Sequence, residues 1–432
     1  MKQFFKKPYL LFFSILLFFT PLILVTNTNE LFEFPKMFFI YIFGLFIIFF
    51  FISDLIINKP KIVKPSVPIL LFLLSTFLST IFSSHFYTSF FGYYSRFNDG
   101  FLSYLIFFGL YFVAINKLNR EDLFKLLEVS LLPIVPISIY GLIQHFGGPS
   151  IFWNLPAVER AYSTIGQPNW LAQYLSMLLP VCLFFAITDS FNKFKYWFFL
   201  YSIGFFCLWV TYSMSGLVGF ISGVVVLSLV ITHKKKDVSN YSSEMASNNV
   251  LTRVAFLVLI SLSISITNMG IFKGKVNDAI TDIKRTVSVV KKVYALDNSY
   301  EISDPGFIRI ELWKSTFKLI KSSPKVFLIG TGPETFPYHF QPFRNTKLNY
   351  SSEWDYVFNK PHNYYLELWC ESGVLTLLAY MLLLYILSRK LPWFLIPSLI
   401  VFMVTNIFGW PTVSTTLIFW FFLSWSDIWR KE

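Results

Sequence analysis

Apolar runs of about twenty residues recur along the whole chain, and they constrain its fold more than any other feature. Each run is long enough to cross a bilayer whose hydrocarbon core is roughly 30 Å thick. Backbone polar groups in lipid must bond to one another, so only helices and closed barrels span a membrane. No run alternates with the period of two that a membrane barrel requires. The sequence therefore predicts an all-α polytopic membrane protein.

The composition agrees with lipid as the solvent for much of the surface. Only 14% of the 432 residues are charged and 55% are apolar, whereas soluble domains carry about 25% charged residues. The 53 Phe side chains are too many for one soluble core. The three Cys residues show neither metal-ligand spacing nor a disulfide framework, so we expect them to be small buried side chains.

We expect about twelve transmembrane helices. They lie near residues 9–25, 37–57, 67–84, 100–116, 123–145, 169–188, 196–213, 215–232, 251–270, 363–387, 392–409 and 412–428. The first run follows several Lys residues as a signal peptide would, but it lacks a small-residue cleavage site, so we expect an uncleaved span. The chain then divides into helices 1–9 (residues 1–270), an extracytoplasmic helical loop (271–361) and helices 10–12 (362–432).

Basic residues alternate between the short connections. One set of connections holds Lys2, Lys6, Lys7, Lys59, Lys61, Lys64, Lys117, Arg120, Lys193, Lys195, Lys234, Lys235, Lys236, Arg389, Lys390, Arg430 and Lys431. The opposite short connections hold only Lys36, Arg96 and Arg160. The positive-inside rule places the basic set, with both termini, in the cytoplasm. Most of the net charge of +12 is thus a topology signal that faces anionic lipid, not a nucleic-acid-binding surface.

The face whose short connections hold few basic residues, called here the sparse face, also carries a long loop. This loop has helical patterns of its own. Apolar residues recur at three and four from Val276 to Tyr294, which predicts an amphipathic helix. A second helix is predicted over Phe307 to Ser323, with Pro324 at its end and the Gly/Pro turn IGTGPETF after it. A loop of this length is usually functional, and we expect a small helical cap over the external membrane face.

The sparse face also carries the residues that suggest chemistry. Arg96, Arg160, Arg309, Arg344 and His362 all fall in segments that we place at this membrane boundary. Arg binds phosphate bidentately and stays charged at any relevant pH. Two or three Arg side chains around a pyrophosphate would hold a lipid-diphosphate donor and stabilise it as a leaving group. A His at the pocket edge can accept a proton from an incoming hydroxyl near neutral pH.

Structural roles are open alternatives for the same residues. An Arg at the membrane boundary often serves as a snorkelling anchor, and His362 also fits a cap-like position at the start of a helix. No HExxH, paired CxxC or DxD motif supports a metal, and GTGPETF lacks the Lys and Ser/Thr of a phosphate-binding loop. We therefore expect no cofactor, with the donor's own phosphate bond as the source of energy.

Four segments, in order, resemble the O-antigen ligase family of bacterial envelope enzymes, which includes O-antigen ligases, O-antigen polymerases and protein O-oligosaccharyltransferases. PHNYYLELWCESGVLTLLAY from Pro361 is similar to the family's His-Asn…Leu…Glu-x-Gly segment, which opens a late span after a large periplasmic loop. The other three segments are RIELWKSTFKLIKSSPKVFLIGTGPETF from Arg309, RAYSTIGQPNWLAQYL from Arg160, and FGYYSRFNDGFLSYL, which contains Arg96.

This resemblance implies an enzyme of the bacterial cytoplasmic (inner) membrane. Such an enzyme moves a glycan from an undecaprenyl-diphosphate carrier to an acceptor hydroxyl at the external face, without metal or nucleotide. His362 would be the base that activates the acceptor, and Arg160 and Arg309 would hold the diphosphate, with help from Arg96. Asn363 follows the base in the same motif and is a further substrate-binding candidate.

The chain departs from the family pattern at one place. Many relatives carry Ser-Arg-Gly where this chain has Met214 and Ser215 before Gly216. One basic contact is therefore missing, or Arg344 or Lys360 supplies it from the long loop. This leaves ligase, polymerase and protein glycosylation open, with a glycan, a lipid or a protein as the acceptor.

Transport is the main alternative to transfer. A transporter or lipid-linked glycan flippase usually buries ionisable residues at mid-membrane, whereas these spans hold few charges and the polar residues gather at one face. A glycan polymerase of the cell-wall shape and division family is a third alternative, but no acidic loop residue is placed to act as its base. The sequence favours the transferase, with membrane lipids and no nucleic acid among its partners.

Overall fold

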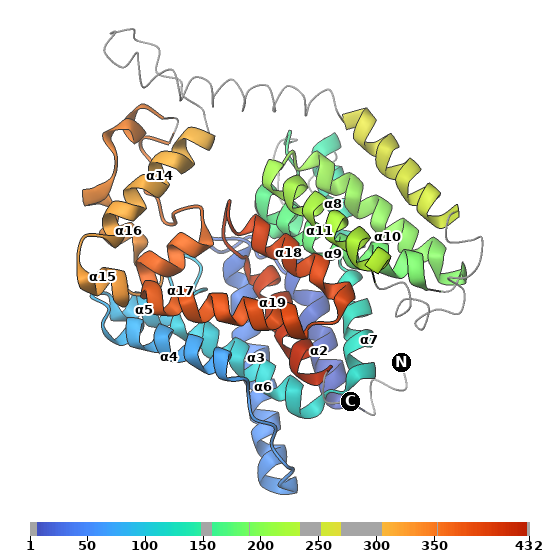
Figure 1. Cartoon of the computed structure of the whole chain (residues 1–432), viewed down its shortest axis with the longest axis horizontal. Coiled ribbons are helices and arrows are strands. Elements are labelled where there is room, and N and C mark those ends of the chain that lie inside the picture. Colours follow the sequence, from blue (N-terminus) through green and yellow to red (C-terminus); the bar gives the residue numbers. More distant parts are fainter. Residues whose placement is uncertain are drawn as a thin grey trace.

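The computed structural model of the chain describes residues 7–147, 158–189, 191–233, 252–268, 305–351 and 353–429. Each predicted span coincides with one helix or with two consecutive helices (Figure 1). Their bounds are α2 Pro8–Phe19 with η1 Thr20–Leu22, α3 Glu33–Asn58, α4 Val67–Ile81, α6 Phe101–Lys117, α7 Arg120–Leu131 with α8 Ile134–Phe146, α9 Pro168–Thr188, α10 Phe191–Val210, α11 Met214–His233, the helix Thr252–Asn268, α17 Tyr364–Lys390, η6 Trp393–Leu395 with α18 Ile396–Thr405, and α19 Val413–Ile428.

Five of these segments are long and apolar enough to cross a membrane by length and composition: α3, α7 with α8, α9, α11 and α17. The remaining described helices include shorter apolar ones of 10–17 residues, such as α4, α6 and α19. The prediction of a multi-pass helical membrane protein is thus confirmed for the described residues. The number of twelve crossings stays a prediction.

Helix α9 lies at the centre of the bundle, while α3 lies at its edge. In the most apolar part of α9, 94% of the residues are buried against other helices, compared with 22% in α3. The outward side chains of α3 are large and apolar, among them Phe38, Ile42, Phe46 and Phe49. A soluble protein would not expose such a face, and lipid is the solvent that suits it.

Glycines let α11 approach its neighbours closely. A Cβ atom at Gly219 would lie 2.6 Å from Cγ2 of Thr405, and one at Gly223 would lie 2.5 Å from Cγ2 of Val401, both on α18. In lipid the hydrophobic effect does not drive helices together. Small residues at their contacts stabilise the association instead, because they allow close van der Waals packing. Helices α11 and α18 therefore form one tightly packed pair beside α9.

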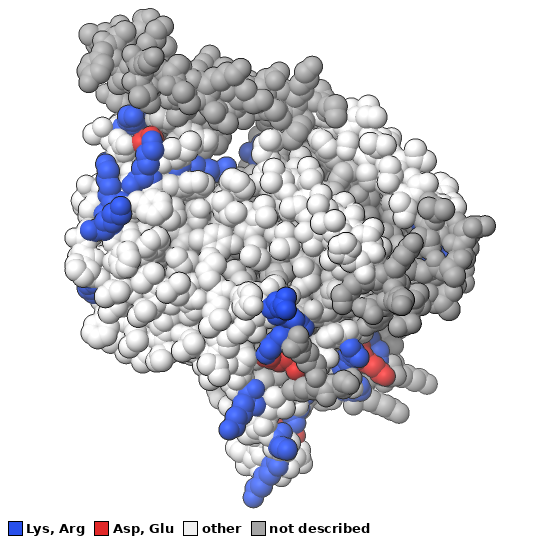
Figure 2. All heavy atoms as spheres, in the orientation of Figure 1, with Lys and Arg blue, Asp and Glu red and all other residues white. Residues whose placement is uncertain are grey.

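The two ends of the described chain meet at one face of the bundle. Nζ of Lys7 lies 2.8 Å from Oδ1 of Asp122, and the guanidinium of Arg120 lies 3.3 Å from the ring centroid of Trp429. Both contacts involve the first turn of α7. In Figure 2 the charged atoms gather at two opposite ends of the molecule, and the broad face between them is almost free of charge. This distribution matches a membrane belt between two aqueous faces.

The described part of the long loop packs on the start of α17. It contains α14 Pro305–Ile320, α15 Pro324–Leu328 and α16 Phe336–His339. The helix predicted over Phe307–Ser323 is therefore present as α14, and Pro324 begins the next short helix. The amphipathic helix predicted over Val276–Tyr294 lies outside the described residues.

The Gly/Pro turn after α15 is what fastens the loop to α17. The backbone N–H of Gly332 donates to the carbonyl of Glu371 over 2.7 Å. The Glu371 carboxylate accepts hydrogen bonds from the N–H groups of Glu334 (2.8 Å) and Phe336 (2.9 Å). At Gly373 the backbone leaves helical geometry with φ 80°, where an L side chain would be strained. The turn thus docks where α17 is kinked.

Candidate functional site

A polar pocket opens where several helices end on the loop-bearing face. His362, Arg309 and Asn169 line it together, although they come from the segment before α17, from α14 and from α9. The cavity between its walls has a volume of about 20 Å³. The other lining residues are Gln167, Trp170, Gln173, Ser215, Thr405, Phe408, Gly409 and Trp410. Of the site residues predicted from the sequence, Arg309 and His362 line this pocket, whereas Arg96, Arg160, Arg344 and Asn363 are not among its lining residues.

His362 has an unusual backbone. Its φ is +53°, in the left-handed region that non-glycine residues occupy at a cost of about 1–3 kcal/mol. Asn363 caps α17, because its Oδ1 accepts from the N–H of Leu366 over 3.1 Å. The helix-cap role considered for His362 thus belongs to its neighbour. The imidazole instead lies against Trp410, with ring centroids 5.1 Å apart.

Two guanidiniums act on the imidazole. Arg309 lines the same pocket, and Arg96 lies over the rings of Trp170 (5.2 Å) and Trp410 (5.9 Å). Burial, then Arg309, then Arg96 lower the pKa of His362 from 6.5 to about 4, because each of them disfavours the imidazolium. At neutral pH the ring is uncharged, so one ring nitrogen is open to accept a proton.

Arg96 also has unused hydrogen-bonding capacity. Its Nη1 is buried and has no hydrogen-bond partner among the described residues. A buried guanidinium nitrogen without a partner is costly, and an anionic oxygen would satisfy it. The rings of Trp170 and Trp410 hold the guanidinium beside the pocket that they line, since a cation over a ring is attracted to its face.

Arg160 is not a lining residue of the pocket, but it contacts one. Its Nε donates to the carbonyl of Thr211 over 2.9 Å, and its Nη2 donates to Oδ1 of Asn169 over 3.0 Å. It therefore orients a side chain that lines the pocket and links the start of α9 to the turn before α11. Burial lowers the pKa of Arg160, yet a guanidinium remains charged at any relevant pH.

Arg344 lies away from this pocket wall. Its Nη2 donates to the carbonyl of Trp354 over 2.7 Å, and the guanidinium lies 5.2 Å from the ring centroid of Phe358. Ser215 lines the pocket at the position where many relatives are expected to carry Arg. Among the described residues of the loop, Arg309 lines the pocket and Arg344 does not.

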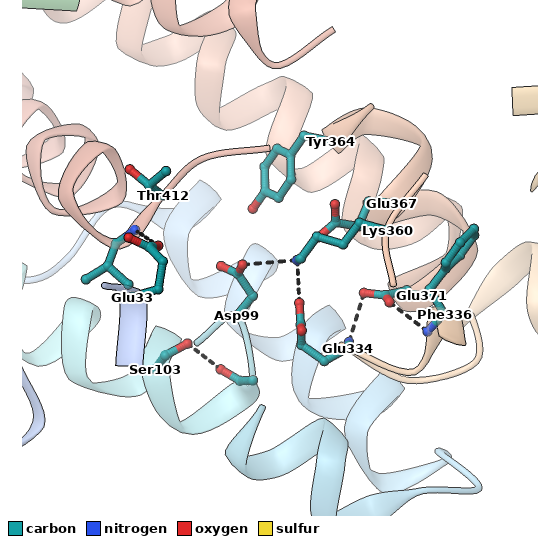
Figure 3. Close-up of polar contacts among 12 residues, drawn as sticks. Glu33, Asp99, Ser103, Glu334, Phe336, Lys360, Tyr364, Glu367, Glu371 and Thr412 are labelled. Carbon is teal, nitrogen blue, oxygen red and sulfur yellow. Dashed lines mark hydrogen bonds and ion pairs between the residues drawn. The ribbon is translucent and has the colours of Figure 1, made fainter. Parts of the chain in front are cut away.

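Lys360 belongs to a buried ionic cluster that the sequence did not reveal (Figure 3). Its Nζ lies 3.2 Å from Oδ2 of Asp99, 2.5 Å from Oε1 of Glu334 and 2.5 Å from Oε1 of Glu367. These carboxylates come from the segment before α6, from the loop turn and from the first turn of α17. Burial alone would lower the pKa of Lys360, but the carboxylates outweigh it and raise this pKa well above its ordinary value.

The same three carboxylates are the candidate metal ligands of the described part of the chain. One oxygen from each lies within 4.8 Å of the others. The ammonium of Lys360 is already bonded to all three, so a covalently attached cation sits among them. Lys360 also lies 5.8 Å from the ring centroid of Trp410, which touches His362 and Arg96. The cluster therefore contacts the pocket wall through Trp410.

These apolar helices, with a pocket at one end that Arg309 and His362 line, are those of a multi-pass helical membrane protein. Residues 197–381 match the family model described as O-antigen ligase. This part of the chain is thus similar to the O-antigen ligase family, as the resemblance of the sequence motifs indicated. The matched part contains Arg309, Lys360 and His362, whereas Arg96 and Arg160 precede it. Comparison with curated proteins and with solved structures gave no match.

Proposed function

We propose that the protein transfers an oligosaccharide from an undecaprenyl-diphosphate carrier to an acceptor hydroxyl at the outer face of the bacterial cytoplasmic membrane. In this orientation both termini are cytoplasmic. The single observation that carries the proposal is that His362 and Arg309 line one pocket, with Arg96 stacked on two of its walls. A base beside two cations suits an anionic leaving group and a hydroxyl nucleophile.

The reaction follows from these groups. The donor diphosphate binds to Arg309 and to the unpartnered Nη1 of Arg96, while Arg160 holds Asn169 in the pocket wall. The acceptor oxygen attacks the anomeric carbon and forms a new C–O bond. The bond from that carbon to the diphosphate oxygen breaks, and its electron pair leaves with the diphosphate. The acceptor proton moves to His362. A single direct displacement inverts the anomeric configuration.

Donor binding and base strength are coupled in this site. The two guanidiniums that oppose protonation of His362 are the ones that a diphosphate would neutralise. Once the donor is bound, the imidazolium gains an anionic neighbour and the pKa of the ring rises. The base is therefore weak in the empty pocket and stronger in the loaded one, which disfavours proton transfer before the donor is in place.

The test is transfer by the purified full-length protein, with a lipid-diphosphate oligosaccharide and a membrane extract as the source of acceptor. We expect His362→Ala to lower the transfer rate by about 10²–10⁴-fold, the usual contribution of a general base, and Arg309→Ala to weaken donor binding. His339→Ala is the matched control, because its ring bonds to Ser84 outside the pocket. Full transfer by a folded His362→Ala protein would refute the assignment of the base.

Loss of the gene in its host separates the acceptor classes. Envelope glycans reduced to single attached units indicate a polymerase, whereas full chains that accumulate on the lipid carrier indicate a ligase. Loss of glycan from proteins alone indicates protein glycosylation. Movement of the donor across vesicles without a new covalent bond would favour the transporter alternative.

A further inference from the structure

A second pocket lies at the other end of the same helices. Helix α11 lines the first pocket with Ser215 near its start and the second with His233 at its end. Helix α18 lines the first with Thr405 and the second with Ile396. At 1.5 Å per residue, the 20 residues of α11 extend over about 30 Å. The second pocket is therefore at the opposite membrane boundary, among the segments that the basic-residue pattern places in the cytoplasm.

The walls of this second pocket are apolar and aromatic. Leu229, Val230 and Ile396 form one side, and Trp393 and Trp429 contribute rings. Both rings are held in place. Trp429 packs under the guanidinium of Arg120 at 3.3 Å, and Trp393 packs edge-on against Phe184 with centroids 5.2 Å apart. A cavity of about 670 Å³ remains between these walls.

The rim of the second pocket is basic. Arg389, Lys390 and His233 line it together with Ser388, whose hydroxyl donates to the Tyr385 carbonyl over 2.7 Å. Nζ of Lys390 lies 3.4 Å from Oδ1 of Asp427, and this side chain is still 31% exposed. The sequence continues with Lys234, Lys235 and Lys236 directly after His233. Arg389 and Lys390 beside an apolar wall distinguish this cavity from a purely apolar groove between helices.

We propose that this pocket binds the head group of an anionic membrane phospholipid. The phosphodiester bonds to Arg389 and Lys390, and the start of an acyl chain lies against Leu229 and Ile396. Basic pockets between membrane helices on the cytoplasmic side suit such head groups, because the charge pairs with phosphate while the walls match the chain. A free phosphate ion would use the rim and leave the apolar wall without an occupant.

The experiment uses the purified, delipidated full-length protein in neutral detergent. Its unfolding midpoint is measured against phosphatidylglycerol, phosphatidylcholine and inorganic phosphate. We expect saturable stabilisation by phosphatidylglycerol alone. The variant Arg389→Gln with Lys390→Gln should weaken that binding at least about tenfold, since each basic residue near anionic lipid contributes measurably. The matched control is Lys59→Gln with Lys61→Gln, which removes two exposed charges at the end of α3, away from the pocket.

Each other outcome overturns the proposal. Equal weakening in the control variant would mean diffuse charge attraction, and equal stabilisation by inorganic phosphate would mean a free-anion site. No response to phosphatidylglycerol would mean that no such site exists. If the double variant does not fold, Ser388→Glu places a negative charge on the rim and must weaken phosphatidylglycerol binding in the same assay. The proposal stands apart from the glycan chemistry, so transfer activity plays no part in the test.

Discussion

The ammonium of Lys360 lies 2.5 Å from Oε1 of Glu367, and both side chains are buried. This pair ties the segment that carries His362 to the first turn of α17. Because Lys360 also bonds to Asp99 and Glu334, one cation balances carboxylates from three other segments of the chain. The position of the candidate base therefore depends on a contact two residues away from it.

We predict that Lys360→Met destabilises the protein by about 3–5 kcal/mol, because it leaves buried carboxylates without a cation. The measurement is the free energy of unfolding in detergent. Glu367→Gln in the Lys360→Met background should recover part of the loss, since it removes one of the uncompensated charges. A pair of substitutions whose effects simply add would show that the two side chains are not coupled.

The acidity of His362 gives a second prediction. Because its pKa is lowered to about 4, the ring stays neutral, and reactive toward an acylating reagent, at pH 5–6. Arg309→Gln removes a positive neighbour, so the pKa rises and reactivity at pH 5 falls. The measurement is pH-dependent carbethoxylation of His362, read by mass spectrometry on the donor-free protein. Reactivity in the wild type that is lost near pH 6.5 would contradict the role of the two guanidiniums.

Arg160→Lys is predicted to raise the KM for the donor about tenfold and to lower the melting temperature no more than the matched control does. Lysine keeps the charge but cannot bridge the Thr211 carbonyl and the Asn169 side chain at once. A hydrogen bond to a charged group contributes about 1.5–3 kcal/mol. The matched control is Arg253→Lys, because Arg253 donates to the Asp189 carbonyl at the far end of α9. Equal effects of both substitutions on the donor KM would count against Arg160.

Gly219→Val is predicted to destabilise the protein by about 1–3 kcal/mol, the usual cost of overpacking. Its Cβ would lie 2.6 Å from Cγ2 of Thr405, so α11 and α18 must separate. Gly409→Ala is the control for stability, because its Cβ meets no atom closer than 3.9 Å. The measurement is thermal unfolding in detergent, and a fully stable Gly219→Val protein would disprove the close contact.

The helices were predictable because lipid imposes a simple rule on the sequence. A run of apolar residues has one stable outcome in a membrane, so spans such as 169–188 and 215–232 coincide with α9 and α11. The shared face of Arg309 and His362 was predictable from the alternation of basic connections. Hydrophobic periodicity did not predict that the helix breaks at Leu132 and Pro133, between α7 and α8, because the residues on both sides of the break are apolar.

The ionic cluster around Lys360 escaped sequence analysis for a physical reason. Asp99 and Lys360 are 261 positions apart, and no local pattern records which charge will meet which. A signal was nevertheless present. Glu367 falls within a predicted span, and an ionisable residue there requires a partner. That partner is Lys360 and not His362, in agreement with the helical spacing, which places neither Glu367 nor Glu371 on the face of His362.

The left-handed backbone at His362 makes two variants more informative than one. Glycine occupies this conformation without steric cost, so His362→Gly removes the ring and relaxes the chain, whereas His362→Ala removes the ring and keeps the strain. An inactive glycine variant that unfolds no more easily than its parent would trace the defect to the missing proton acceptor alone. Torsional freedom at a single residue thus provides a way to tell a chemical loss from a mechanical one.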